Sequence, residues 1–251
     1  MFYIFLFIIG CCIGSFLNVC IYRIPEHISI VTPRSFCPNC RRQIKTKDNI
    51  PIFSYILLRG RCRYCKEYIS VQYPIVEGIT GMMLVILFYQ FGMSKYFGIY
   101  SLLFVALVVV FAVDIKTMII PDRITIPGVI VGIIFSLVLR HIPVKDSLFG
   151  ILGGAGFFIV VAVLGRLIYK KDVMGFGDVK LAGMLGSFLG WRSLIVTIFL
   201  SLLLGSIFGI LFCLITKRSL KTIIPFGPFL SVSAMLTIFF RERLLGLYGL
   251  V

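Results

Sequence analysis

Charged residues are scarce in this chain of 251 residues: they make up 14% of it, and only ten are acidic. A soluble domain carries about 25% charged residues and roughly 45–50% apolar ones, whereas 59% of this chain is hydrophobic. The shortage of charge excludes an ordinary soluble domain. Because the apolar runs are as long as spanning helices need, we predict an all-α polytopic membrane protein.

Basic residues are missing from the first part of the chain. No Lys or Arg precedes Arg23, so the opening apolar run lacks the basic segment of a cleavable signal. Ile8-Ile9-Gly10-Cys11 is similar to a lipoprotein cleavage box, but the same absence argues against cleavage there. We therefore interpret residues 2–21 as a first spanning helix that the protein retains.

Apolar runs of nearly spanning length recur along the rest of the chain, and about 20 residues cross a bilayer. They predict about eight transmembrane helices, near 2–21, 72–92, 97–113, 124–140, 147–168, 178–191, 193–215 and 222–240. Ten of the 25 basic residues lie in 23–66. The positive-inside rule therefore places this loop in the cytoplasm, and it explains the net charge of +15 without nucleic acid.

The predicted organisation has three parts. Residues 1–22 form the first transmembrane helix, 23–71 form a cytoplasmic loop between helices 1 and 2, and 72–251 form a seven-helix membrane domain. The loop contains Cys37-Pro-Asn-Cys40 and Cys62-Arg-Tyr-Cys65, separated by 21 residues.

Two Cys-x-x-Cys pairs are typical of tetrahedral zinc sites. We predict that Cys37, Cys40, Cys62 and Cys65 bind a structural zinc ion, since a site of four thiolates leaves no open position for catalysis. Two disulfides, redox use or free thiols are the alternatives. A cytoplasmic location keeps thiols reduced and favours metal.

Two carboxylates stand at the ends of apolar runs. Asp114 closes the run 102–113, and Asp178 opens another within Gly175-Phe176-Gly177-Asp178-Val179-Lys180. Carboxylates at membrane helices are costly and are functional by default. In the predicted topology both lie at the cytoplasmic end of their helices, so they can form a pair. Two carboxylates that share a site do not both ionise readily, and one can act as a base on water while the other acts as an acid.

This pair alone also fits other functions. Intramembrane carboxylates carry protons and ions in transporters, so an ion-coupled transporter with a zinc-stabilised loop is the main alternative to a protease. The predicted spans have few polar groups near their middle, which disfavours a transporter. A non-catalytic assembly scaffold would not need two carboxylates at matching depth.

Other polar residues near the predicted membrane surface have structural interpretations. Asp122 follows a proline and is typical of a cap for the next helix. Glu77 is expected to pair with an arginine of the loop. Gly14 and Asn18 lie one turn apart on the first helix, which favours close, hydrogen-bonded helix packing.

Short motifs occur in a fixed order along most of the chain. They include Gly14-Ser15-Phe16-Leu17-Asn18-Val19, Pro33-Arg34-Ser35-Phe36-Cys37-Pro38-Asn39-Cys40, Leu58-Arg59-Gly60-Arg61-Cys62-Arg63-Tyr64-Cys65, Tyr73-Pro74-Ile75-Val76-Glu77, Asp114 with Pro121-Asp122, the segment Gly175 to Lys180, and Ile224-Pro225-Phe226-Gly227-Pro228. In their order and joint presence they resemble the bacterial type IV prepilin peptidases. These membrane enzymes cut the leader from prepilins and methylate the new N-terminus. The compact length is similar to that of the competence-type enzymes of low-GC Gram-positive bacteria.

The resemblance implies a GxGD-type aspartic protease of the bacterial cytoplasmic membrane, with Asp114 and Asp178 as its catalytic residues. It implies prepilin or pseudopilin substrates whose short basic leader ends in Gly, serving pilus assembly, protein secretion or competence. A substrate glutamate would meet Lys180 or an arginine near the membrane. Methylation implies S-adenosylmethionine. No Gly-rich nucleotide motif follows a strand, so the sequence assigns no single residue to the methyl donor. By resemblance only, the segment 14–25 and the cysteine loop 23–71 are candidates for the methyltransferase part. For Glu77, contact with the substrate or with the new N-terminal amine is the alternative to pairing with a loop arginine.

Overall fold

The computed structural model describes the chain except for residues 171–173, 217–223 and 248–251. The described residues are helical, apart from turns, loops and two isolated β-bridges. They divide into two compact units, Met1–Ser101 and Leu102–Val251, and each is described by itself. The functional division at residues 22 and 71 remains a prediction.

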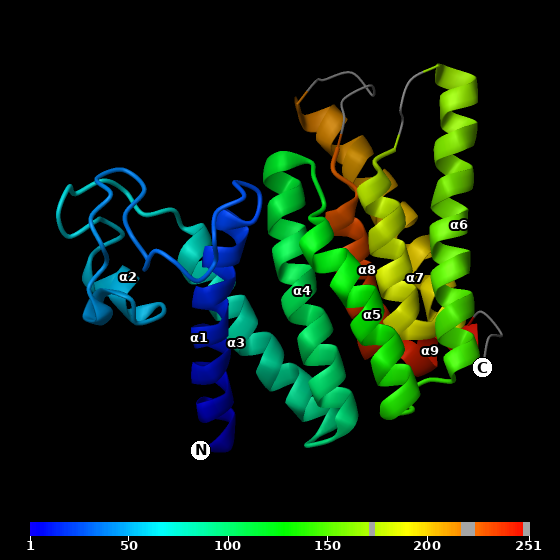
Figure 1. The fold of residues 1–251 in the computed structure, drawn as a ribbon, viewed down its shortest axis with the longest axis horizontal. Helices are drawn as coiled ribbons and strands as arrows, with labels where there is room; N and C mark the ends of the chain where they lie inside the picture. The colour runs from blue at the N-terminus through cyan, green and yellow to red at the C-terminus, as the bar shows by residue number, and fades with distance from the viewer. Residues whose placement is uncertain (171–173, 217–223, 248–251) are drawn as a thin grey trace. The chain divides into compact units, whose positions relative to one another are not determined.

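In the first unit, helix α1 (Phe2–Arg23) packs against helix α3 (Gln72–Phe91) (Figure 1). The two backbones approach closely because small residues line the contact. A methyl group added at Gly10 would lie 2.6 Å from Cα of Gly81, and one added at Gly14 would lie 2.6 Å from Cα of Glu77. The packing predicted for Gly14 is therefore confirmed.

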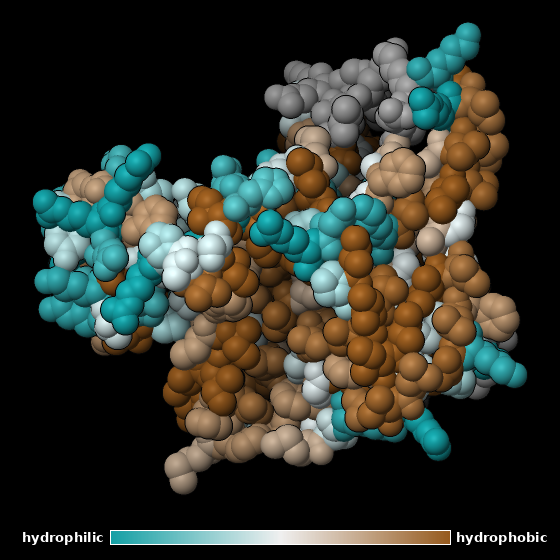
Figure 2. Space-filling view, viewed as in Figure 1, coloured by the Kyte–Doolittle hydropathy of each residue, from teal (hydrophilic) through white to brown (hydrophobic). Residues whose placement is uncertain are grey.

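The segment between α1 and α3 is mostly irregular and hydrophilic (Figure 2). It contains a 3-10 turn, η1 (Thr46–Asp48), and a short helix, α2 (Phe53–Leu57). Arg23, in the last turn of α1, is buried and donates hydrogen bonds of 2.8 Å to the carbonyls of Ser29 and Pro33. These bonds hold the chain that leads from α1 into the first cysteine pair.

The boundary between the units falls within helix α4 (Lys95–Thr117). The second unit continues with α5 (Asp122–Val138), α6 (Val144–Tyr169), α7 (Phe176–Thr216), α8 (Gly227–Phe239) and α9 (Arg241–Leu247). Helices α6 and α7 pack closely along their length (Figure 1). Gly150 faces the backbone of Gly186 at their crossing, with no room for a methyl group on either side.

Helix α7 is interrupted at Gly190, whose φ of 75° and ψ of 165° are not helical. A glycine adopts this conformation at little cost, whereas L side chains rarely do. The break divides α7 at the junction between the predicted spans 178–191 and 193–215. Helix α8 corresponds to the later part of the predicted span 222–240, of which 222–223 lie outside the described residues.

Among the described residues, five helices are long and apolar enough to cross a membrane: α1, α3, α4, α6 and α7. The face shown in Figure 2 carries hydrophobic side chains along α6, with hydrophilic residues toward its ends. This distribution is that of helices surrounded by lipid. The protein is therefore a multi-pass membrane protein with a cluster of four cysteines between α1 and α3.

Candidate active site and metal centre

The Asp114 carboxylate is held by the start of another helix. Asp114 lies near the end of α4 and is only 4% exposed. Its Oδ2 accepts a hydrogen bond of 2.9 Å from the backbone N–H of Gly227, the first residue of α8. A methyl group at Gly227 would lie 2.6 Å from that oxygen, so only glycine allows this approach. The partial positive charge of a helix N-terminus also favours a carboxylate there.

Asp178 lies in the first turn of α7, beside Asp114. Its backbone N–H donates to the carbonyl of Gly175 at 3.2 Å. Its Oδ1 is buried and has no hydrogen-bond partner among the described residues. The two carboxylates are close enough for their charges to interact. The structure thus brings together the two aspartates that the sequence singled out, and it leaves one of their oxygens free to bind a proton or a water molecule.

Ile120 sets the spacing around this pair. It is buried in the connection between α4 and α5. A methyl group at Gly177 would lie 2.8 Å from its Cβ, and one at Gly227 would lie 3.1 Å from its Cδ1. The Ile120 side chain therefore packs against both Gly177, which precedes Asp178, and Gly227, whose N–H binds Asp114.

Asp122 does not cap the next helix, and that prediction is wrong. Pro121 occupies the N-cap position of α5, and no side-chain capping bond forms. Both carboxylate oxygens of Asp122 instead accept hydrogen bonds of 2.7 Å from Nζ of Lys180 on α7. Proline fixes the turn that starts the helix, which leaves the following carboxylate available for this ion pair. Lys180, which lies two residues after Asp178, is therefore paired with the Asp122 carboxylate.

The four cysteines form one cluster. The sulfur atoms of Cys37, Cys40, Cys62 and Cys65 all lie within 4.8 Å of one another, and those of Cys37 and Cys65 are 3.8 Å apart. A zinc ion bound to four thiolates at about 2.3 Å places the sulfurs about 3.8 Å apart. The donor set and its spacing therefore fit a tetrahedral metal ion, and this structure gives no support to disulfides.

The two cysteine pairs have the same backbone structure. The N–H of Cys37 donates to the carbonyl of Arg42, and the N–H of Arg41 donates back to Cys37. Cys62, Glu67 and Lys66 repeat this pattern 25 residues later. Arg41 and Lys66 both have positive φ, 54° and 60°. The loop is therefore an internal repeat of two knuckles, each presenting two thiols to the centre.

The thiols influence one another's protonation. Partial burial opposes ionisation of Cys62, but the backbone N–H groups of Cys65 and Tyr64 and the neighbouring thiols lower its pKa to about 7. Cys65 receives a hydrogen bond from the backbone of Glu67, which favours its thiolate, yet burial and the other thiols raise its pKa to about 11. Clustered thiols cannot all ionise without a cation, which is a further reason that the site fits a metal ion.

Two residues of the first unit have structural partners. The side-chain amide of Asn18 donates to the carbonyls of Gly14 and Tyr73, at 3.3 and 3.1 Å, which confirms its packing role. Oε2 of Glu77 accepts a bond of 2.7 Å from the backbone N–H of Ile52. The predicted pairing of Glu77 with a loop arginine is therefore wrong: within the described residues its carboxylate secures a backbone turn instead.

Sequence reasoning missed the roles of Gly227 and Ile120. The signal for Gly227 is its motif, Ile224-Pro225-Phe226-Gly227-Pro228, but the motif alone does not indicate a hydrogen bond to Asp114. Ile120 carried no signal, because an isoleucine in an apolar connection has no unusual chemistry. The 25-residue repeat was visible as Arg34, Cys37, Cys40 and Ile44 recurring as Arg59, Cys62, Cys65 and Ile69.

Comparison with known proteins identifies the family. A model of the bacterial peptidase A24 N-terminal domain matches residues 8–91, and one of the type IV leader peptidase family matches residues 101–210. The chain is 31% identical over 273 residues to a prepilin leader peptidase/N-methyltransferase of Aeromonas salmonicida, covering 97% of this chain and 92% of that protein. This chain belongs to the prepilin leader peptidase/N-methyltransferase family. The assignment confirms the predicted resemblance, the peptidase class and the location in a bacterial membrane.

Other members of the prepilin leader peptidase/N-methyltransferase family match similarly. The protein of Pseudomonas aeruginosa is 31% identical over 264 residues, covering 96% of this chain and 91% of that protein. The protein of Myxococcus xanthus is 39% identical over 220 residues, covering 87% of this chain but only 65% of that longer protein. No solved structure matches the chain.

Proposed function

We propose that this protein removes the leader from type IV prepilins or pseudopilins by aspartic-protease chemistry, with Asp114 and Asp178 as its catalytic residues. One observation carries the assignment. Two carboxylates from separate helices lie close together. One is fixed by the N–H of Gly227, and the other has a buried oxygen with no partner in the part of the chain that the structure describes. Family membership makes a peptidase a better explanation of this pair than an ion-coupled transporter.

The proposed reaction uses the pair as acid and base. A water molecule lies between the carboxylates, and the ionised one removes its proton as the oxygen attacks the scissile carbonyl carbon. The protonated carboxyl donates to the carbonyl oxygen, forming a tetrahedral intermediate. When the C–N bond breaks, a proton passes to the leaving amine. The Gly227 N–H keeps one Asp114 oxygen in place throughout, so the second oxygen stays oriented toward the reaction.

We further propose eight membrane crossings with the cysteine loop in the cytoplasm. Five crossings are the five long helices, with α7 counted once. The other three are the segment of α7 after Gly190, α5 and α8. Asp114 and Asp178 then lie at the cytoplasmic face, where the leader of a membrane-inserted prepilin ends. A membrane-impermeant maleimide should label Lys145→Cys in intact cells and Lys116→Cys only after permeabilisation. Labelling of both from one side would contradict this topology.

The cysteine cluster is proposed to hold a structural zinc ion, and methyl transfer is proposed to use S-adenosylmethionine. The amine of the new N-terminus would take the methyl group from the sulfonium and lose a proton, leaving S-adenosylhomocysteine. The match of residues 8–91 to the N-terminal domain model, and the names of the relatives, support this second activity. No residue is assigned to the donor.

Cleavage of a prepilin by the purified full-length protein tests the peptidase proposal. Asp114→Asn and Asp178→Asn should each reduce the cleavage rate by about 10²-fold to 10⁴-fold or more, because each removes an acid–base group. Metal content and helix content should not change. The matched control is Glu26→Gln, which alters an exposed carboxylate after α1. Cleavage at the wild-type rate by either aspartate variant would end the assignment.

A further inference from the structure

A groove between α6 and α7 lies away from the aspartate pair. It encloses about 860 Å³, a volume in the range of ligand sites, which is about 300–1,000 Å³. It reaches the break at Gly190, where a methyl group would lie 3.5 Å from Cβ of Asp146. From Asp178 to Gly190 the helix rises about 18 Å, at about 1.5 Å per residue. The groove is therefore at the opposite end of this helical segment from the candidate active site.

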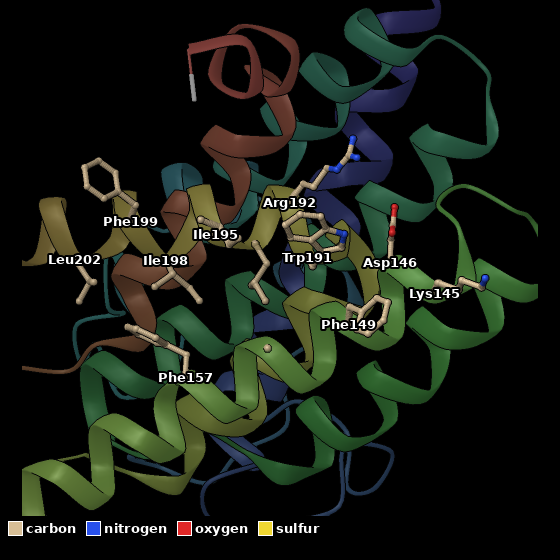
Figure 3. A pocket seen from close by; sticks show the side chains of 12 residues that line it. Lys145, Asp146, Phe149, Phe157, Trp191, Arg192, Ile195, Ile198, Phe199 and Leu202 are labelled. Atoms are coloured by element: carbon tan, nitrogen blue, oxygen red, sulfur yellow. The ribbon is translucent and has the colours of Figure 1, made fainter. Parts of the chain in front are cut away.

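The two ends of the groove differ in chemistry (Figure 3). Lys145, Asp146 and Arg192 gather at one end, together with Trp191. The guanidinium of Arg192 lies 5.5 Å from the centre of the Trp191 ring. Toward the other end the lining is apolar, with aromatic and aliphatic side chains: Phe157, Ile198, Phe199 and Leu202. A charged mouth with a net charge of +1 and an apolar channel is complementary to a molecule with an anionic head and a hydrocarbon chain.

The length of the groove matches one leaflet of a bilayer. Its lining on α6 runs from Lys145 to Phe157, which is about 18 Å along a helix. Half of the hydrocarbon core is about 15 Å thick, so the groove ends near the bilayer centre. A substrate helix that crosses the membrane would need contact over both leaflets. Tryptophan and basic side chains at one end are also typical of the membrane interface.

We propose that this groove is a binding site for one anionic glycerophospholipid, of the phosphatidylglycerol type. The phosphate lies between Lys145 and Arg192, with an acyl chain along the apolar lining toward Leu202. In the topology proposed above, this lipid comes from the outer leaflet. The site is separate from the candidate active site, because its lining comes from α6 and from the part of α7 that follows Gly190.

Gly153 offers a direct test, since it lines the groove and a methyl group there would meet no atom within 4 Å. Gly153→Leu therefore starts its side chain in open space and directs it into the groove. Gly156→Leu is its matched control: the position lies three residues along α6, has equal space and does not line the groove. Gly153→Leu should abolish lipid retention, and Gly156→Leu should leave it unchanged.

The measurement is native mass spectrometry of the full-length protein, purified in detergent and exposed to equal amounts of phosphatidylglycerol and phosphatidylcholine. The wild type should retain one phosphatidylglycerol with about fivefold preference, the effect of one net positive charge near a headgroup. Replacing both Lys145 and Arg192 with Gln should remove the preference. Equal retention of the two lipids, no retained lipid, or unchanged retention by Gly153→Leu would overturn the proposal. A prepilin crosslink to Gly153→Cys would also overturn it, in favour of a substrate helix.

Discussion

The cysteine loop brings together four thiols, and the helical second unit brings together two carboxylates, but the two regions do so by different means. In the loop, four thiols converge from two short knuckles that have few apolar side chains beneath them. In the second unit, two carboxylates converge from helices whose buried residues pack tightly, among them Leu107, Val110, Leu181 and Leu185. In the loop the proposed metal ion would hold the ligands together, whereas in the second unit packing holds the helices.

This difference determines how each region should fail. Without the proposed metal ion, the loop would keep only hydrogen bonds and exposed turns, which do not fold so small a segment alone. Loss of a single close contact in the second unit leaves the helices in place but shifts the carboxylates.

Removal of the metal should unfold the loop and spare the second unit. Structural zinc contributes on the order of 10 kcal/mol or more to small zinc domains. Chelation, or Cys62→Ser, should therefore give fast hydrogen exchange across residues 34–69, while exchange in α6 and α7 stays slow. Cys12→Ser, which changes an exposed cysteine outside the cluster, is the control. Equal loss of protection in α7 would show that the regions do not fold independently.

Gly227→Ala should impair cleavage without unfolding the protein. The added methyl group would displace the Asp114 carboxylate, and a shift of about 1 Å in a catalytic group can reduce the rate by about 10²-fold. Gly209→Ala is the control, because its methyl group would lie 3.7 Å from the nearest side chain. The check is kcat/KM with a prepilin, alongside metal content. Wild-type cleavage by Gly227→Ala would mean that this hydrogen bond does not position the reacting carboxylate.

The ion pair between Asp122 and Lys180 should have a modest effect. Both side chains are partly exposed, at 55% and 37%, and exposed ion pairs contribute about 0.2–1 kcal/mol. Asp122→Asn and Lys180→Met should each change cleavage by less than about fivefold. The double variant should cleave at the same rate as either single variant, because each of the three variants removes the same ion pair. A much larger loss for Lys180→Met alone would show that this lysine also contacts substrate.

The smallest expected effect is the part of the loop's pH dependence that comes from Asp48. Hydrogen bonds of 2.6 and 2.7 Å from Arg63 hold the pKa of Asp48 below its ordinary value. The pair therefore stabilises the loop above the ordinary pKa of about 3.9, and this contribution is lost as the pH falls through the lower, folded value. The ratio of hydrogen-exchange rates in Asp48→Asn and wild type should exceed one near neutral pH and approach one in acid. A ratio independent of pH would contradict this assignment.

Helix positions were the most predictable part of the fold. Spans at 2–21 and 72–92 correspond to α1 and α3, and the division between 178–191 and 193–215 falls at the Gly190 break. Apolar runs of this length have few alternatives in lipid, because backbone groups must pair internally. The interpretation of Asp122 failed for a different reason. Its local sequence is typical of a helix cap, but its actual partner lies 58 residues away.

The sequence by itself determined the membrane class, the helices, the two cysteine pairs and the two candidate aspartates. Each of these features follows from the hydrophobicity of a short segment or from residues a few positions apart. The tertiary structure alone decided which groups meet: the N–H of Gly227 with Asp114, Ile120 between two glycines, and the groove that begins at Lys145 and Arg192. These contacts join residues far apart in the chain. Their geometry follows from how whole helices pack, which no local pattern specifies.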